Sequence, residues 1–298
     1  MANLKEVRTR IASVSSTQQI TSAMKMVSAA KFRRAQNAIT GMRPYTAQLQ
    51  EIISDIDTGD GIQTPYHDAR PVQTVLLVVV TSNKGLCGAF NSNVLKQAQQ
   101  RINHYRQQLP EGHIRVLSIG KKSSELLVRQ KDLVLTTQDE LLDAPAFDTV
   151  ASLADCIMEQ FTSKEIDCVE IVYNQFKNSL TQVLSTEQFL PLAAASSAVG
   201  AAGTQEGSSS SANDYIYEPS KEDILREMVP LTLRSTIYRI ILDSLASEHG
   251  ARMTAMQKAT DNATELLKDL TLSYNKARQA AITNEIIEIF SGSEALKG

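Results

Sequence analysis

The N-terminal end of the chain has the hydrophobic spacing of a long helix. From Leu4 to about Asp57, only Gly41 and Pro44 disfavour helix. Spacings of three and four alternate along this stretch, which is typical of a coiled coil. The positions that follow this alternation are Leu4, Val7, Ile11 and Val14, continued by the polar residues Gln18 and Thr21.

The C-terminal end repeats this alternation over a longer stretch. We expect a helix that opens at Pro219 and Ser220, is interrupted at Pro230 and then runs to the C-terminus. Nine positions keep the alternation, and heptads of that length predict a left-handed coiled coil. They are Met253, Met256, Thr260, Ala263, Leu267, Leu270, Tyr274, Ala277 and Ala281.

Helix length then predicts the architecture. Helices of about 54 and 60 residues span roughly 80 and 90 Å, whereas a compact globule of this chain length is about 50 Å across. We therefore expect the two helices to pair antiparallel as a rod. Counting from ends at Asp57 and Pro219 places Met24 level with about Arg252 and leaves residues past about Ala281 without a partner.

The middle of the chain alternates strand and helix patterns. A continuous apolar run at 73–81 predicts a buried parallel strand, and further strands are expected at 114–119, 167–173 and 182–190. Helices are expected at 91–108, 121–129 and 151–162. The predicted fold is thus α/β plus coiled coil. A Rossmann-like α/β domain at 67–217 is inserted between N-terminal (1–66) and C-terminal (218–298) coiled-coil helices, and its low-complexity stretch 193–213 is expected to be a mobile surface loop.

Composition narrows the class of protein. Hydrophobic residues make up 42% and charged residues 21% of the chain, as in globular proteins. No segment reaches the ~18 apolar residues of a membrane span, and we expect no signal peptide. The three cysteines include no close pair, so neither disulfides nor zinc is indicated and a reducing compartment is expected. Residues 1–43 carry eight basic side chains against Glu6, which favours an acidic partner.

Catalytic and nucleotide motifs are missing. The turn after the first strand, SNKGLCGAF, fits neither a dinucleotide nor a phosphate-loop fingerprint, and Gly120-Lys121-Lys122-Ser123 lacks the first glycine of a phosphate loop. Cys87 has no histidine in a recognisable supporting motif, so a small buried thiol is the better interpretation. We expect no enzymatic activity, cofactor or metal in this chain itself.

Several sequence runs resemble one family closely. They are Ile20–Lys31 with Arg33-Arg34-Ala-Gln36, Ser82–Gly88, Ser247–Met253 and Tyr274–Gln279. The terminal signature I-T-x-E-x-x-[DE]-x-x-x-G-A is met by Ile282, Thr283, Glu285, Glu288 and Gly292, and Ser293 replaces its last alanine. Together these runs resemble the γ subunit of bacterial F-type ATP synthases.

The resemblance implies a central-stalk rotor that couples proton-driven rotation to conformational cycling of the catalytic β subunits. Its implied partners are the hexamer of α and β subunits, the ε subunit and the membrane c-ring, at the cytoplasmic face of the bacterial inner membrane. The coupling contacts implied are Met24, Lys25, Arg33, Arg34, Arg252, Arg278, Gln279, Thr283 and Glu288. Ile282, Ile286, Ile287, Ile289 and Phe290 would form an axial tip that turns in an apolar sleeve.

Three other interpretations remain open from the residues alone. A basic coiled coil could bind nucleic acid through Lys31, Arg33 and Arg34, although no base-reading module accompanies them. An α/β domain could bind a nucleotide in an enzyme, although the glycine spacing does not fit. A generic coiled-coil adaptor would account for the rod but not for the terminal runs.

Overall fold

The chain forms two compact units in the computed structural model. The structure describes residues 4–60, 64–109, 113–129, 133–143, 145–178, 181–192, 218 and 220–295. One unit, here the coiled-coil unit, consists of Met1–Ala29 and Arg252–Gly298, and the other, the sheet unit, of Ala30–Ala251. The helices α1 (Leu4–Asp60) and α5 (Lys221–Ala295) contribute to both. The predicted fold class, α/β plus coiled coil, is confirmed.

The sheet unit is built on five strands in the order β3-β2-β1-β4-β5. The central strand β1 (Thr74–Val80) pairs in parallel with β2 (His113–Ile119) and β4 (Cys168–Phe176). At the edges, β3 (Val134–Thr137) is parallel to β2, and β5 (Gln182–Leu190) is antiparallel to β4. Six consecutive buried residues make β1 apolar on both faces, which is why it occupies the centre.

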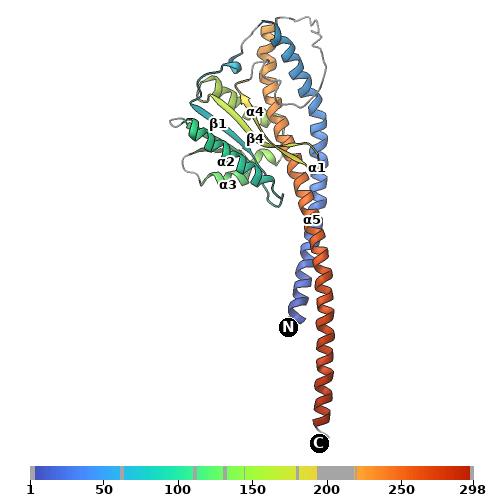
Figure 1. The fold of residues 1–298 in the computed structure, drawn as a ribbon. Helices are drawn as coiled ribbons and strands as arrows, with labels where there is room; N and C mark the ends of the chain where they lie inside the picture. Colours follow the sequence, from blue (N-terminus) through green and yellow to red (C-terminus); the bar gives the residue numbers. More distant parts are fainter. Residues whose placement is uncertain are drawn as a thin grey trace. The chain divides into compact units, whose positions relative to one another are not determined.

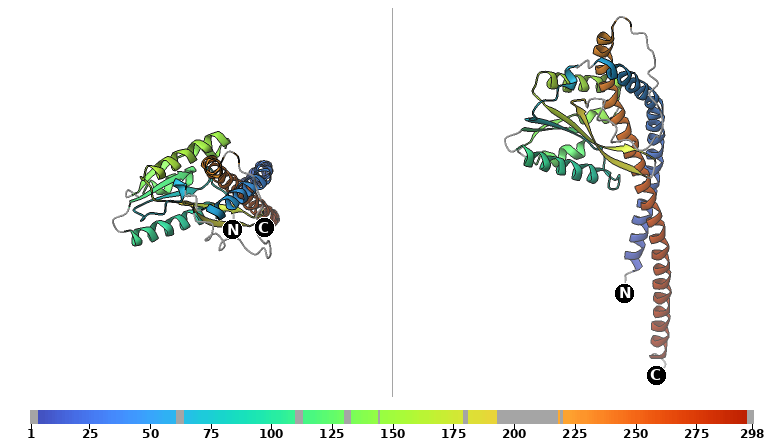
Figure 2. Two further views of the ribbon diagram at one scale, coloured as in Figure 1. Left: turned by 90° about the horizontal axis from the view of Figure 1, so that it is seen from above. Right: turned by 45° about the horizontal axis from the view of Figure 1, so that its top comes forward.

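Helices cover both faces of this sheet (Figures 1 and 2). On one face, α2 (Phe90–Gln108) and α3 (Lys121–Leu127) share a core with alternate residues of β1. On the other, α4 (Phe147–Thr162) and the first turns of α5 share the larger core with the remaining β1 residues. A third cluster joins Phe32 and Ile39 of α1 to Phe176, Leu242 and Ala246. Two short 3-10 helices, η1 (Pro65–His67) and η2 (Asp139–Leu142), complete the unit.

The predicted elements of the middle region are confirmed, and one strand was not predicted. The edge strand β3 has only four residues and too few apolar positions to stand out as a pattern. It forms because β2 offers it an open edge, with Arg115 to Ser118 aligned to Val134 to Thr137. The stretch 193–213, expected to be a mobile loop, lies outside the described residues.

The expected interruption at Pro230 is wrong. Pro230 lies inside the 75-residue helix α5, near its start. A proline within a helix removes one backbone hydrogen bond and costs about 3 kcal/mol in an exposed setting. Here the flanking Leu225, Val229 and Leu233 are buried in the larger core, so tertiary packing offsets that cost and the helix continues.

The coiled-coil unit pairs α1 with α5 through the predicted seam, defined as the three-four positions given above. Each of these seam residues is buried or half-buried. Two polar contacts show the register: Thr260 Oγ1 donates to Thr21 Oγ1 at 2.8 Å, and Gln18 Nε2 donates to Thr264 Oγ1 at 2.8 Å. This register places Met24 opposite about residue 257, about five residues beyond the level near Arg252 that was expected from the helix ends. Side-chain contacts along the seam set the register, which cannot be counted from the helix ends.

Candidate functional site

The candidate site is a set of partner-contact surfaces, and its first part lies on α1. In the coiled-coil unit, Met24 and Lys25 are half-buried, one turn before the buried Ser28. In the sheet unit, Arg33 and Arg34 are exposed on the same helix. Arg33 and Arg34 thus lie on the outside of α1, as expected for a surface that meets acidic groups, while Lys25 is partly enclosed.

Arg252 differs from the other expected contact residues. It lies on α5 in the coiled-coil unit and is only 7% exposed. Charged side chains are seldom buried this far unless they are paired. Its expected contact with a partner stays a prediction.

The last turns of α5 form the second part of the candidate site. Arg278, Gln279, Thr283 and Glu288 are all exposed. Thr283 Oγ1 donates to the carbonyl of Gln279, which fixes the hydroxyl against its own helix. These polar groups lie where α1 reaches its end, since the register places Leu4 opposite about residue 277.

The third part is an apolar end on α5. Every described side chain from Ile282 to Ser293 is exposed, so the predicted loss of a helical partner past Ala281 is confirmed. Five of these side chains are large and apolar, with exposed fractions of 48% to 73%. They are Ile282, Ile286, Ile287, Ile289 and Phe290, defined here as the apolar tip. At 100° per residue they fall within one arc of about 160° on the helix.

Other exposed apolar residues were missed by the sequence reasoning. Ile20, Met26 and Val27 on α1, and Leu266 and Leu272 on α5, are 47% to 65% exposed within the coiled-coil unit. Each lies off the three-four seam, and this is the signal that could have found them. Ile20 and Val27 are seven residues apart and share one face of α1, so they are candidates for a partner-contact surface.

The sheet unit fills its own strand-to-helix turns rather than leaving a phosphate cradle. The Asn91 side chain accepts from the Ser82 backbone N–H at 3.0 Å and lies 3.2 Å from the Cys87 sulfur, which is buried. The Asn83 side chain accepts from the Lys121 backbone N–H at the start of α3 at 3.1 Å. These two backbone N–H groups are thus already paired and are not available to a nucleotide phosphate.

The ion pair of Arg70 and Asp167 lies at the start of β1. Asp167 accepts from the backbone N–H groups of Gln73 and Thr74, both at 2.9 Å, and from Arg70 Nε at 2.5 Å. Arg70 also donates to the Phe161 carbonyl at 2.8 Å. Burial alone would raise the pKa of Asp167, but these donors outweigh it and hold its pKa below the usual value.

Neither metal binding nor membrane crossing is indicated within the described part of the chain. Among those residues no three histidine, cysteine or acidic side chains gather as metal ligands. None of the described helices combines the length and apolarity needed to cross a bilayer.

A family model and several known proteins match this chain over nearly its whole length. A family model described as ATP synthase matches residues 3–296. The ATP synthase gamma chain of Flavobacterium johnsoniae is 53% identical and that of Bacteroides fragilis 44% identical, each aligned over 99% or more of both chains.

Solved structures show the same fold at lower identity. A chain of the Euglena gracilis mitochondrial ATP synthase (OSCP/F1/c-ring) is 21% identical with a TM-score of 0.67, covering 98% of this chain and 94% of that one. A chain of the Tetrahymena thermophila mitochondrial ATP synthase central stalk and c-ring is 24% identical with a TM-score of 0.55, covering 80% and 99%.

Proposed function

Because the chain belongs to the ATP synthase gamma-chain family, we propose that it is the central-stalk rotor of a bacterial F-type ATP synthase. It is a non-catalytic subunit. It couples proton-driven rotation of the membrane c-ring to the cycle of the catalytic β subunits, in synthesis and in reversible hydrolysis. The exposed apolar tip of α5 supports this function most directly, because an exposed patch of five large apolar side chains marks a surface that a partner covers.

The rotor drives the β subunits by contacting their conformations differently. A ligand or partner shifts a conformational equilibrium only by its differential affinity for the states. An asymmetric shaft meets each β subunit with a different face at each angle, so one turn takes each β subunit through open and closed states in sequence.

The basic and polar contact residues supply the angle-dependent part of this action. Lys25, Arg33 and Arg34 would face acidic groups of the β subunits, and Met24 would contact the same subunits from α1. Arg252 would contribute from α5. Near the end of the shaft, Arg278, Gln279, Thr283 and Glu288 would make polar contacts that form and break as the shaft turns.

The apolar tip would act as the pivot. Apolar contact is non-directional, so a sleeve of apolar residues holds the shaft end at every angle without hydrogen bonds that must break at each step. The tip residues are Ile282, Ile286, Ile287, Ile289 and Phe290, and their wide arc suits contact on more than one side.

The proposed assembly follows from these roles. The coiled coil would lie in the axis of the α and β hexamer, and the α/β domain at 67–217 would bind the ε subunit and the c-ring. The helices at 1–66 and 218–298 would form the shaft. As part of the F1 portion the chain is peripheral to the membrane, and we place it at the cytoplasmic face of the bacterial inner membrane.

Co-purification tests the proposed function. A tagged copy expressed in its own host should bring down a complex that hydrolyses ATP and contains α and β chains. The untagged strain, carried through the same steps, measures background. Recovery of the tagged chain alone, or with nucleic acid that is released by salt, would contradict the proposal and favour the nucleic-acid interpretation.

A further inference from the structure

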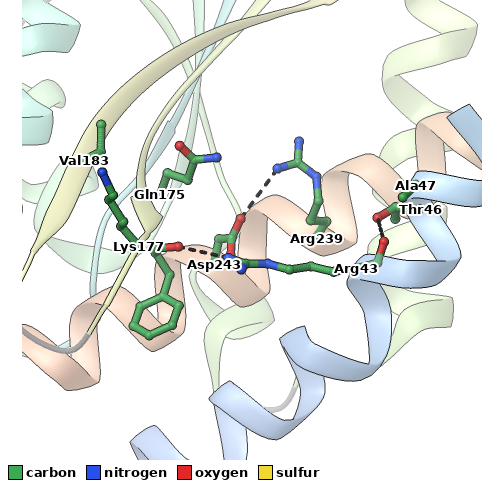
Figure 3. A pocket seen from close by; sticks show the side chains of 9 residues that line it. Arg43, Thr46, Ala47, Gln175, Lys177, Val183, Arg239 and Asp243 are labelled. Atoms are coloured by element: carbon green, nitrogen blue, oxygen red, sulfur yellow. Dashed lines mark hydrogen bonds and ion pairs between the residues drawn. The ribbon is translucent and has the colours of Figure 1, made fainter. Parts of the chain in front are cut away.

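A buried carboxylate in the sheet unit links α1, α5 and the sheet edge. Asp243 on α5 has a side chain that is only 2% exposed. Arg43 Nη2 of α1 lies 3.5 Å from its Oδ1, and Arg239 Nη1, one turn earlier on α5, lies 3.5 Å from its Oδ2 (Figure 3). The Asp243 carboxylate thus forms one ion pair with an arginine of α1 and one with an arginine of α5.

Both arginines extend the link to the sheet. Arg43 Nη2 also donates to the carbonyl of Phe176 at the end of β4, at 2.9 Å. Arg239 Nη2 donates to Glu187 Oε2 of β5 at 3.0 Å, and the Tyr173 hydroxyl of β4 donates to the other oxygen of Glu187. Ion pairs and charged hydrogen bonds therefore connect α1 and α5 with the last two strands.

This link borders a space that no side chain fills. A cavity of about 550 Å³ lies between α1, α5 and the ends of β4 and β5, lined among others by Arg43, Lys177 and Asp243. Apolar packing cannot hold α1 across an open cavity, because dispersion and burial need contact. Phe32 and Ile39 of α1 pack against Phe176 beside this cavity, and Arg43 adds polar contacts from α1 to the same sheet edge.

We propose that Arg43, Asp243, Arg239 and Glu187 form a clamp that keeps α1 from sliding on α5 and on the sheet when torque passes through the sheet unit. Apolar contacts resist separation, but because they are non-directional they favour one register less strongly than directional bonds do. Charge-assisted hydrogen bonds are directional and fix the register of the parts they join. The clamp is a positioning device, and it rests on the proposed rotor function.

Arg43→Met tests the clamp with the least risk to folding. The Arg43 side chain is half exposed, so its loss leaves no cation buried, and Asp243 keeps Arg239. Arg115→Met is the matched control, since Arg115 also pairs with a carboxylate in the sheet unit, at 3.4 Å, but does not contact α1 through that pair. Both are made in the complete ATP synthase, reconstituted in vesicles.

The readout is proton pumping per ATP hydrolysed. In Arg43→Met we expect hydrolysis to stay near wild type and the pumping ratio to fall by about threefold or more, because loss of two charge-assisted bonds shifts a locked-to-slipped equilibrium severalfold or more. Arg43→Lys keeps the positive charge but lacks the forked guanidinium donors, so its pumping ratio should lie between those of wild type and Arg43→Met. Arg115→Met should match wild type.

A covalent bridge supplies the positive test. In a chain with the exposed Cys156 replaced by serine, Arg43→Cys and Lys177→Cys place two thiols on the same cavity. A short bismaleimide that joins them should restore the pumping ratio, whereas single-thiol capping should not.

The outcomes separate the clamp from the rotor function. A wild-type ratio in Arg43→Met, an equal loss in Arg115→Met, equal losses of hydrolysis and pumping with reduced subunit content, or no recovery on bridging would each overturn the clamp. If the wild-type chain is absent from the pumping complex, the rotor function itself fails.

Discussion

Replacing Asp167 by asparagine should weaken the sheet unit by a predictable amount. Asp167 is the acceptor for two backbone N–H groups at the start of β1 and for Arg70, and the side chains of Arg70 and Asp167 are 15% and 11% exposed. Asparagine has the same shape but carries no charge, and one of its two oxygens becomes an NH₂ donor.

The size of the effect follows from these contacts. The NH₂ group of the variant must face either Arg70 or the N–H groups of Gln73 and Thr74, so at least one donor–acceptor contact becomes donor against donor. Breaking a buried ion pair from one side costs about 3–5 kcal/mol. Because both side chains keep some solvent contact, we expect about 3 kcal/mol of lost stability at pH 7.

The loss should depend on pH with a definite sign. The pKa of Asp167 is lowered in the folded chain, so its contribution is fully present above the unfolded pKa of about 3.9 and is lost as pH falls through the lower folded pKa. The difference between wild type and Asp167→Asn should therefore be constant from pH 7 to about pH 5 and shrink below about pH 4.

Hydrogen–deuterium exchange of peptides covering β1 and β4, corrected for intrinsic rates, measures the local opening free energy of wild type and Asp167→Asn at each pH. Glu165→Gln is the control, because its pair with Arg115 is exposed on both sides and should contribute little. A difference below about 1 kcal/mol at pH 7, or one that does not change down to pH 3.5, would show that ionised Asp167 does not stabilise the sheet unit.

Four other outcomes are expected. Thr21→Cys with Thr260→Cys, in a chain whose exposed native cysteine is serine, should form a disulfide readily, and moving the second cysteine about five residues earlier should abolish it; equal yields would contradict the register. Met24→Lys should impair ATP-driven proton pumping in the complex by adding a charge contact, and wild-type pumping would remove Met24 from the contact surface. Deleting Glu288–Gly298 should leave assembly and some rotation but weaken the complex, measured as loss of subunits on dilution; a harmless deletion would exclude the pivot. Burial raises the pKa of Asp243 more than its two arginines lower it, so ionising Asp243 costs stability above its unfolded pKa. The stability advantage of wild type over Asp243→Asn should therefore shrink as pH rises from about 4 to 7. An advantage that grows over this range would show the sign to be wrong.

The candidate site was predictable where it depends on local sequence. The exposed apolar tip follows from Ile282 onward, where the spacing leaves the seam. The exposure of Ile20, Met26 and Val27 could also have been predicted, because all three lie off the three-four seam of α1. The burial of Arg252 was hidden, because a charged residue near a seam gives no local sign of being enclosed.

Local sequence by itself determined the elements of this protein and their type. The continuous apolar run of β1, the heptads of both end helices and the incompatible glycine spacing are properties of neighbouring residues, and the structure keeps each of them. Such patterns reflect backbone geometry and burial of one face, which act over a few residues.

The way these elements meet depends on contacts between residues that are distant in the sequence. Pro230 stays helical because the core around Leu225 and Leu233 packs against it, and β3 forms because β2 offers an open edge. The register of the coiled coil and the meeting of Arg43 with Asp243, 200 positions apart, likewise depend on contacts between distant residues. The combined energy of several such contacts reaches the few kcal/mol of a local helix or strand preference, so tertiary contacts can override that preference. No window of neighbouring residues contains the information that sets these contacts.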